Sequence, residues 1–525
     1  MPGFPRDGRS AASITASVVN AMKSRPNILH ICTDQQRADS IRALGGWMKT
    51  PRLDKLVAEG TSFTRAYTPA AECVPARCCM ITGRYADRTN CSFNGDPMPG
   101  DEIPTIMSLL AGAGYRTHGV GKCHFTPDSY ALKGFQSRSV SEEIPVDPAR
   151  DDYLRFLDRN GFGDVLEPLG ARSEMYYVPQ PSRVPERLHH SRWVADECME
   201  FLRKEGGEKP WYLYAGFIQP HPPFSPPDPW HKLYRSTDVP LPRIPENAKD
   251  LLCYVNHRQN RFKHRDQGID MNLVRCIRAY YAACVSFIDH QVGRLMECLA
   301  EEGQLDNTLV VFTSDHGELL GDFGSFGKRS FHEAAQRVPM IVRLPGVFEA
   351  GRVCESPVSL VDLLPTFAGL AEAGAPDETD GMDLREIAAG TKREEPIFFH
   401  YNRAGQAIFG SVGEAGKYVW SAPDQREYFF PAGPEGIADD ARPSSVRDDG
   451  CLELRGKVLQ RAAAFSFADE ALSRDKSGWA EYPVLAVPDD PTSGLLFQDP
   501  PLTFPKLPEE YEFDYPANGG GRRKG

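Results

Sequence analysis

Short apolar runs alternate along most of the chain with segments whose apolar positions repeat at helical spacing. Four runs have the length and continuous hydrophobicity of buried parallel strands, at residues 27–33, 211–217, 307–313 and 339–343. Segments with a helical period lie between them, at residues 106–113, 188–202 and 272–300, and strand-like residues 115–120 follow the first of these. This alternation predicts an α/β fold with a doubly wound, mostly parallel central sheet flanked by helices.

The pattern changes after about Ala388. Short strand-like segments separated by glycine and charged turns, at residues 396–401, 407–412 and 417–420, predict an antiparallel sheet in a smaller α+β domain. We therefore expect a disordered N-terminal segment (1–26), a large α/β domain (27–388) and a C-terminal domain (389–525) that ends in an extended arm and a tail. Such an arm is compatible with exchange between subunits of a homo-oligomer, although the sequence leaves the oligomeric state open.

Composition narrows the classes of partner and the compartment. The 525 residues carry a net charge of -12, which repels phosphate backbones at long range and argues against a nucleic-acid partner. Neither a signal-peptide-like apolar run near the start nor a run of about 18 apolar residues elsewhere is present, so a membrane span is not expected. The 13 cysteines are expected to be mostly reduced, and the expected compartment is the cytoplasm.

The segment Cys73-Val-Pro-Ala-Arg77 contains the strongest candidate for a reactive group. Pro75 suits the first turn of a helix, which puts Cys73 near the positive end of that helix and Arg77 one turn further on. A thiolate is favoured in such a place. A buried structural cysteine near a helix start is the alternative for an isolated motif of this kind. The Thr-Gly-Arg at residues 82–84 and the partners below favour the functional interpretation.

Two acidic residues stand where predicted strands end. Asp34 follows the run 27–33, and Asp315 follows 307–313 by one residue. Because the carboxyl ends of parallel strands meet at one edge of a sheet, these carboxylates are expected to lie together. Their oxygen atoms suit Ca²⁺, Mg²⁺ or Mn²⁺. A helix cap is the commoner role of a single aspartate after a strand, but a pair at matched strand ends favours a metal site.

The order of these motifs resembles the sulfatase family within the alkaline-phosphatase-like superfamily, over residues 27–384 or so. The resemblance implies that a formylglycine-generating enzyme oxidises Cys73 to formylglycine, whose hydrate attacks sulfur with one oxygen and later expels sulfate with the other. Ala76 occupies a position where the family often has serine. The expected activity is that of a sulfuric ester hydrolase acting on a small-molecule sulfate ester of a sugar or aryl alcohol. A binding protein with a relict site is the alternative from another class.

The resemblance also assigns roles to five basic residues. Lys122, in Gly-Lys-Cys-His, is expected to bind a substrate oxygen, and His124 to take a proton when sulfate leaves. His221, in Pro-His-Pro-Pro-Phe, is expected to contact the ester and assist the leaving group. Lys328, thirteen residues after Asp315, is expected to hold the sulfate and also to assist the leaving group. Arg77 is expected to stabilise the hydrated aldehyde. Such a reaction needs fixed cations around an anion and an acid for the leaving alcohol.

The expected metal ligands depart from the commonest pattern of the family. Familiar sulfatases have Asp-Asp and Asp-Asn at the two strand ends, whereas this chain has Asp34-Gln35 and Asp315-His316. Together with the modified Cys73, these four residues are expected to hold one divalent cation. The variant resembles choline sulfatases and phosphonate monoester hydrolases. Since imidazole admits nitrogen ligation, Mn²⁺ is the alternative to Ca²⁺, and phosphonate or phosphate esters are the alternative substrates.

Other polar features are expected to carry no chemistry. Cys78 and Cys79 complete no zinc spacing, and the pair His189-His190 is interpreted as a surface feature or a wall on the substrate side. The polar stretch 257–268 is interpreted as a solvated loop or a subunit contact.

Overall fold

The computed structural model describes residues 25–487, apart from 173–175, 205–208, 263–267, 269, 375, 377, 434–435, 440–447 and 466–469. The predicted disordered segment at the N-terminus lies outside these residues except for its last two, and the predicted terminal arm and tail also lie outside them.

A single eight-stranded sheet forms the centre of the large domain, in the order β5-β4-β6-β1-β7-β8-β2-β9. The strands are β1 (Asn27–Asp34), β2 (Thr61–Phe63), β4 (Arg116–Gly121), β5 (Ser137–Val140), β6 (Trp211–Pro220), β7 (Thr308–Ser314), β8 (Met340–Arg343) and β9 (Arg352–Cys354). A small parallel pair, β3 (Ala66–Tyr67) and β10 (Val358–Ser359), lies beside it. All five predicted strands of this domain are therefore present, and the mostly parallel sheet is confirmed.

One predicted strand runs in the other direction. Strand β8 pairs antiparallel with β7 on one side and with β2 on the other, so the expectation of a parallel strand at 339–343 was wrong. The reason lies in the connection, since a parallel neighbour requires a crossover that returns the chain to the opposite edge of the sheet. Residues 315–339 contain only the short helix α11 (Glu333–Gln336) and a 3-10 turn, and the chain enters β8 without crossing over.

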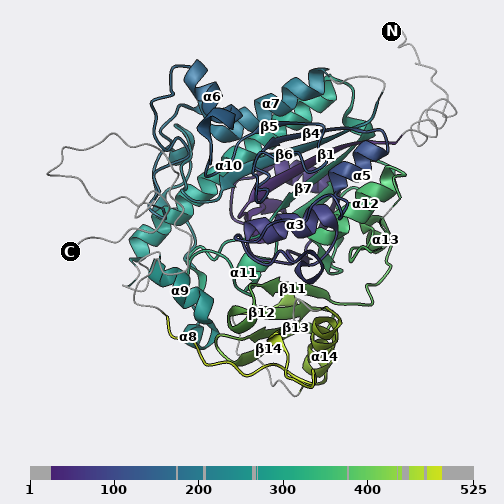
Figure 1. Ribbon diagram of the computed structural model, residues 1–525. Coiled ribbons are helices and arrows are strands. Elements are labelled where there is room, and N and C mark those ends of the chain that lie inside the picture. Colours follow the sequence, from purple (N-terminus) through teal and green to yellow (C-terminus); the bar gives the residue numbers. More distant parts are fainter. Residues whose placement is uncertain are drawn as a thin grey trace, which may run out of the picture.

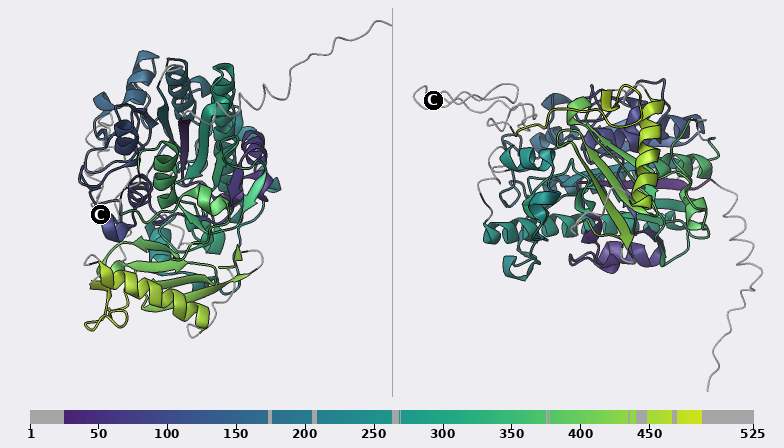
Figure 2. Two further views of the ribbon diagram at one scale, coloured as in Figure 1. Left: turned by 90° about the vertical axis from the view of Figure 1, so that its right-hand side faces the viewer. Right: turned by 90° about the horizontal axis from the view of Figure 1, so that it is seen from below.

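Helices cover both faces of the sheet (Figures 1 and 2). One face carries α2 (Pro51–Glu59), α6 (Asp152–Arg159), α7 (His190–Lys204) and the long α10 (Met271–Glu301), and the other carries α3 (Cys73–Thr82), α5 (Ile106–Gly112), α12 (Leu363–Leu370) and α13 (Leu384–Ala388). Strand β1 shows why both faces are apolar: Ile28 and Cys32 belong to the core under α3, whereas Leu29 and Ile31 belong to the core under α10.

A second, antiparallel sheet follows residue 388 and packs below the large sheet in Figure 1. Its strands are β11 (Ile397–Tyr401), β12 (Ile408–Val412), β13 (Gly416–Ser421), β14 (Arg426–Gly433) and β15 (Gly436–Ile437), and α14 (Asp449–Ala464) packs against them. The predicted antiparallel character is confirmed by the registers of all four pairs. Remaining short helices are α4 (Ala86–Thr89), α8 (Ala248–Leu251) and α9 (Tyr254–Phe262). None of the described helices is both long enough and apolar enough to cross a membrane.

The expectation of a solvated surface was wrong for two polar segments, whereas their other interpretations, a substrate-side wall and a subunit contact, stay predictions. His189 and His190 are buried, and His189 packs edge-on against Phe287 of α10, so the pair is not on the surface. The first part of the polar stretch 257–268 continues helix α9 instead of forming a loop, and Gln259 and Asn260 on that helix are buried. In both cases tertiary contacts, which the local sequence does not reveal, cover the polar side chains.

Candidate active site

The ends of neighbouring strands bring the predicted metal ligands together. Strands β1 and β7 are paired up to Thr33 and Ser314, so Asp34 and Asp315 leave the sheet side by side. The Nε2 atom of His316 lies 3.6 Å from Asp34 Oδ1 and 3.5 Å from Asp315 Oδ1. All of these side chains are buried.

Gln35 turns out of β1 in a left-handed conformation, with φ of 69°. Its backbone N–H donates to Asp315 Oδ1 at 3.1 Å, which ties the ends of the two strands together. Non-glycine residues rarely adopt this conformation, and it is tolerated where surrounding contacts enforce it, as they commonly do at functional sites. The turn brings the amide of Gln35 within 2.7 Å of Lys328 Nζ.

Cys73 is the first residue of α3, as the motif predicts, and its side chain points into this group. Its Sγ lies 3.3 Å from His316 Nε2, 2.9 Å from Lys328 Nζ and 3.9 Å from Asp34 Oδ1. In a formylglycine an oxygen atom would take the place of this sulfur. A structural cysteine packs against apolar atoms, whereas this fully buried one is surrounded by charged groups, so the structural alternative does not describe it.

Arg77 lies behind the two aspartates, one turn along α3. Its Nε donates to Asp315 Oδ2 at 2.9 Å and its Nη2 to Asp34 Oδ2 at 3.3 Å. The remaining donors reach the hydroxyl of Tyr214 at 2.8 Å and the backbone carbonyl of Lys122 at 3.0 Å. The guanidinium therefore bridges the two carboxylates and fixes their position beside Cys73.

Two further strand ends supply basic side chains. Lys122 follows β4 directly, and its ammonium group donates to Asp34 Oδ2 at 2.5 Å and to Glu143 Oε2. His221 follows β6, and its Nδ1 lies 2.7 Å from the carbonyl of Pro222 while its Nε2 faces Glu143 Oε2 at 3.5 Å. Four neighbouring parallel strands thus each end in a residue that the sequence singled out.

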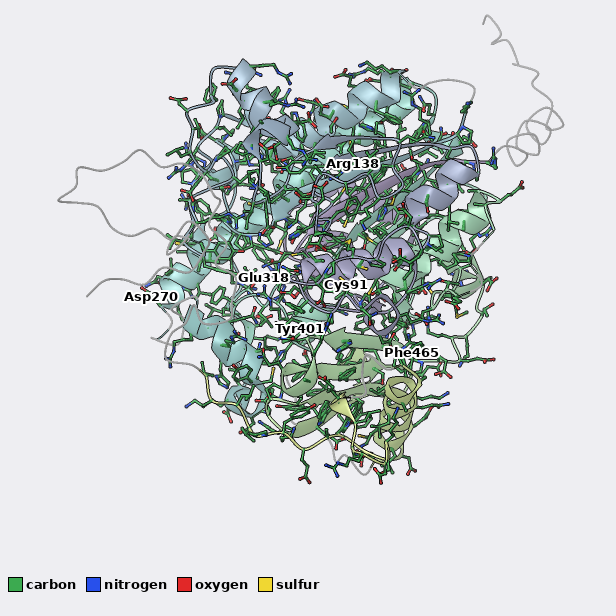
Figure 3. The ribbon with its side chains drawn as sticks, viewed as in Figure 1. Cys91, Arg138, Asp270, Glu318, Tyr401 and Phe465 are labelled. Carbon is green, nitrogen blue, oxygen red and sulfur yellow. The ribbon has the colours of Figure 1, made fainter. Side chains whose placement is uncertain are left out.

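Lys328 lies in the connection between β7 and β8, and its backbone is fixed by hydrogen bonds to a helix. Gln259 of α9 accepts a hydrogen bond from the Lys328 backbone N–H at 3.2 Å and donates its amide to the Lys328 carbonyl. Glu318 accepts from Gly327 N at 2.5 Å, from Tyr177 Oη at 2.8 Å and from the amide of Gln35. In Figure 3 Glu318 lies at the lower end of the large sheet, above the small sheet that carries Tyr401.

Among the described contacts, His124 makes no hydrogen bond or ion pair with another predicted site residue. Its backbone N–H donates to Glu142 Oε1 at 2.9 Å, and φ is 54°. Among the described residues its Nδ1 is buried without a hydrogen-bond partner, and the described contacts include none between its ring and Cys73. Burial, followed by the charge of Lys122, lowers the pKa of His124, which favours a neutral ring that can accept a proton.

Electrostatic pairing keeps the buried acids ionised. Burial by itself raises the pKa of Asp34, but the surrounding cations, Lys122 first, hold it well below its ordinary value. The pKa of Glu143 behaves in the same way, with His221 and Lys122 as its strongest partners. Burial lowers the pKa of Lys122, and Asp34 and Glu143 more than reverse this. The site is therefore a network of compensated charges.

The donor set fits a divalent cation. Ligand atoms of Asp34, Cys73, Asp315 and His316 all lie within 4.8 Å of one another, and Gln35 adds an amide. Carboxylate and amide oxygens with one imidazole suit Ca²⁺ or Mn²⁺, whereas Zn²⁺ favours sites that are rich in thiolates. The geometry alone thus supports the predicted ligands.

A buried cysteine among fixed cations, beside a donor set that suits a divalent metal, is the arrangement that an α/β hydrolase of anionic esters requires. The sulfatase family matches residues 26–373, well over half of the chain, and the protein belongs to that family, within the alkaline phosphatase superfamily. The chain is 29% identical over 439 residues to an arylsulfatase of Clostridium perfringens, which covers 77% of this chain and 88% of that one. It is 30% identical over 458 residues to a choline-sulfatase of Rhizobium meliloti, covering 81% and 86%.

The fold agrees with that family. A phosphonate monoester hydrolase of Agrobacterium radiobacter superposes with a TM-score of 0.72 at 24% identity, covering 87% of this chain and 100% of that chain. The resemblance to sulfatases, including choline sulfatases and phosphonate monoester hydrolases, is confirmed, as is the α/β fold class. The individual roles assigned to the site residues stay predictions.

Sequence reasoning missed several residues that complete the site. They are Glu143, Arg172, Tyr176, Tyr177, Gln259 and Glu318, and all of them contact a predicted site residue directly or through one neighbour. Glu318 stands in the Thr-Ser-Asp-His-Gly-Glu segment, close enough to Asp315 to have been suspected. The others lie in stretches without a motif or a periodic pattern.

Proposed function

We propose that the protein hydrolyses sulfate monoesters with a formylglycine formed from Cys73 as nucleophile. The observation that carries this proposal is the position of Cys73 Sγ, 3.3 Å from His316 Nε2 and 2.9 Å from Lys328 Nζ at a buried helix start. Formylglycine supplies, as its hydrate, one oxygen that takes up the sulfo group and a second that allows its release. Asp34, Asp315 and His316 would hold a divalent cation, which would supply positive charge to the substrate.

The side chains divide the remaining work between binding an anion and moving protons. Lys122 and Lys328 hold the oxygens of the ester from two sides, because both ammonium groups are fixed by buried partners. His221 contacts the alcohol oxygen through Nε2 and, together with Lys328, assists its departure as the bond to sulfur breaks. His124 accepts the proton that is lost when sulfate is expelled. Arg77 keeps the two aspartates in position throughout.

The proposal is tested on protein produced together with a formylglycine-generating enzyme. Mass spectrometry of the peptide that contains residue 73 distinguishes cysteine from formylglycine, and turnover of aryl and sugar sulfates is measured on the same sample. We expect modified Cys73 and sulfate release, both lost in Cys73→Ala. An unmodified cysteine together with no turnover of any ester would favour the relict binding protein and reject the proposal.

Phosphonate or phosphate ester hydrolysis is the second candidate. The Asp34-Gln35 and Asp315-His316 pairs favour it, since an amide in place of a carboxylate lowers the negative charge among the ligands. Rates on an aryl sulfate and on a phenylphosphonate monoester, each with Ca²⁺ or Mn²⁺ added after chelation, separate the two candidates. We propose Ca²⁺ as the resident cation, with Mn²⁺ as the alternative because His316 offers nitrogen.

The compartment is also a proposal. The 13 cysteines, all among the described residues, are free thiols, and we propose the reducing cytoplasm as the place where the enzyme works. Fractionation of the native host, with an antibody against the protein, tests this. Recovery from a secreted fraction would contradict it.

A further inference from the structure

Glu143 lies inside the space where the proposed mechanism puts the anion. Its Oε2 accepts a hydrogen bond from Lys122 Nζ and lies 3.5 Å from His221 Nε2, while its Oε1 is 3.9 Å from Arg172. One oxygen of this carboxylate, Nε2 of His221 and Sγ of Cys73 lie within 4.8 Å of one another. The side chain is buried, with 3% of the residue exposed. A negative charge therefore stands within reach of the nucleophile and of two substrate-binding groups.

This carboxylate competes with the substrate for the same donors. An ammonium group has three N–H donors, and Asp34 and Glu143 occupy two of those of Lys122. Glu143 also faces the His221 nitrogen that is expected to meet the leaving group. An ester oxygen that binds here meets cations whose charge is already balanced in large part.

The net charge of the site decides how this competition affects substrates of different charge. Four carboxylates and four cations lie in direct or near contact: Asp34, Glu143, Asp315 and Glu318 against Arg77, Lys122, Arg172 and Lys328. These eight side chains balance one another, so together they contribute no net charge that attracts the substrate. Without Glu143 the site would be one unit more positive, and a dianion would gain twice as much from that unit as a monoanion.

We propose that Glu143 is a specificity-determining residue that selects monoanionic esters, namely sulfate and phosphonate monoesters, against the dianions of phosphate monoesters. The proposal rests on the proposed function and deepens it, since it concerns the charge of the ester that the same site accepts. It also accounts for a buried acid in a pocket that must bind an anion.

The test is the isosteric substitution Glu143→Gln in the metal-loaded enzyme. Removing a unit charge about 5 Å from the anion, at an effective dielectric constant between those of protein and water, should change the affinity roughly tenfold for each unit of substrate charge. We therefore expect the kcat/KM for 4-nitrophenyl phosphate to rise about tenfold relative to that for 4-nitrophenyl sulfate. Glu143→Asp keeps the negative charge, so the ratio of kcat/KM for the phosphate ester to kcat/KM for the sulfate ester should stay close to that of the wild type.

A binding measurement separates this inference from the proposed function. Calorimetry with sulfate, a dianion, and methanesulfonate, a monoanion of the same shape, needs no turnover, and Glu143→Gln should tighten sulfate about tenfold more than methanesulfonate. Glu333→Gln is the matched control, because Glu333 is another buried acid paired with a buried lysine, Lys417, away from the nucleophile. A folded Glu143→Gln enzyme whose sulfate-to-methanesulfonate ratio equals that of Glu333→Gln would overturn the inference, even if no ester were hydrolysed.

Discussion

The position of Lys328 depends on a residue that no motif contains, and this dependence can be measured. Gln259 contacts the backbone of Lys328 on both sides, as acceptor for its N–H at 3.2 Å and as donor to its carbonyl. The ammonium group of Lys328 lies 2.9 Å from Cys73 Sγ. Since only 1% of Gln259 is exposed, water does not replace these hydrogen bonds when the side chain is removed.

The substitution Gln259→Ala should lower both stability and activity. The net contribution of two hydrogen bonds to the free energy of unfolding is about 1–3 kcal/mol. Loss of the support lets the Lys328 backbone move, and a displacement of about 1 Å in a catalytic group costs up to roughly a hundredfold in rate. We expect kcat for an activated sulfate ester to fall about ten- to a hundredfold, with a smaller change in KM.

Urea unfolding and steady-state kinetics on the same preparations provide the assay. Asn256→Ala is the control, because Asn256 is buried on the same helix α9, and within the described residues its side chain accepts hydrogen bonds from the backbone N–H and thiol of Cys253 alone. The control should lose a comparable amount of stability and keep its kcat. If Gln259→Ala were destabilised like the control and retained wild-type kcat, the assigned positioning role would be wrong.

Three further outcomes are expected. Chelation of the cation should abolish turnover and lower the Tm. Adding Ca²⁺ or Mn²⁺ at about a hundred times its Kd should restore about 2.7 kcal/mol to the free energy of unfolding. An unchanged Tm after chelation would argue against a resident metal. Arg77→Lys keeps the positive charge, but a lysine cannot bridge Asp34 and Asp315. The metal affinity, measured by calorimetry, should therefore fall about tenfold or more. An unaltered affinity would refute the bridging role. Burial, then Lys417, lowers the pKa of His332 from 6.5 to about 3. Because the unfolded chain takes up this proton first, stability is lost as pH falls below 6.5, and His332→Gln should reduce the loss between pH 7 and pH 5 by about 2 kcal/mol, whereas equal losses would contradict the assignment.

The parts of the site that follow from the sequence are those tied to strand ends. Asp34, Lys122, His221 and Asp315 follow apolar or strand-like segments that are readable from residue patterns, and a parallel sheet brings all such ends to one edge. Their convergence therefore required only the correct strands and their parallel direction. Cys73 was found differently, through the order Cys-x-Pro-x-Arg, in which the proline marks the start of the helix, together with the Thr-Gly-Arg that follows and the other motifs.

The parts that could not be predicted depend on contacts between distant segments. Glu143 meets Lys122 because β5 pairs with β4, and nothing near Glu143 in the sequence marks it as a member of the site. Gln259 lies in a stretch so polar that exposure was the natural expectation, yet α9 packs under the connection that carries Lys328. Burial of polar residues of this kind is decided by partners, and a single sequence does not identify the partners.

The same contrast explains why the site is built from so many charges. Each buried acid is costly unless a cation meets it, and each cation needs acids in turn, so a site that must hold an anion and a metal cannot consist of the reacting residues alone. Lys122 illustrates the point, since Asp34 and Glu143 together stabilise its charge and keep its pKa high. The motif residues determine the chemistry of the site. Glu143 and the other residues without a motif balance its charge and support its geometry. We expect differences in substrate choice among related enzymes to arise from positions of this second kind.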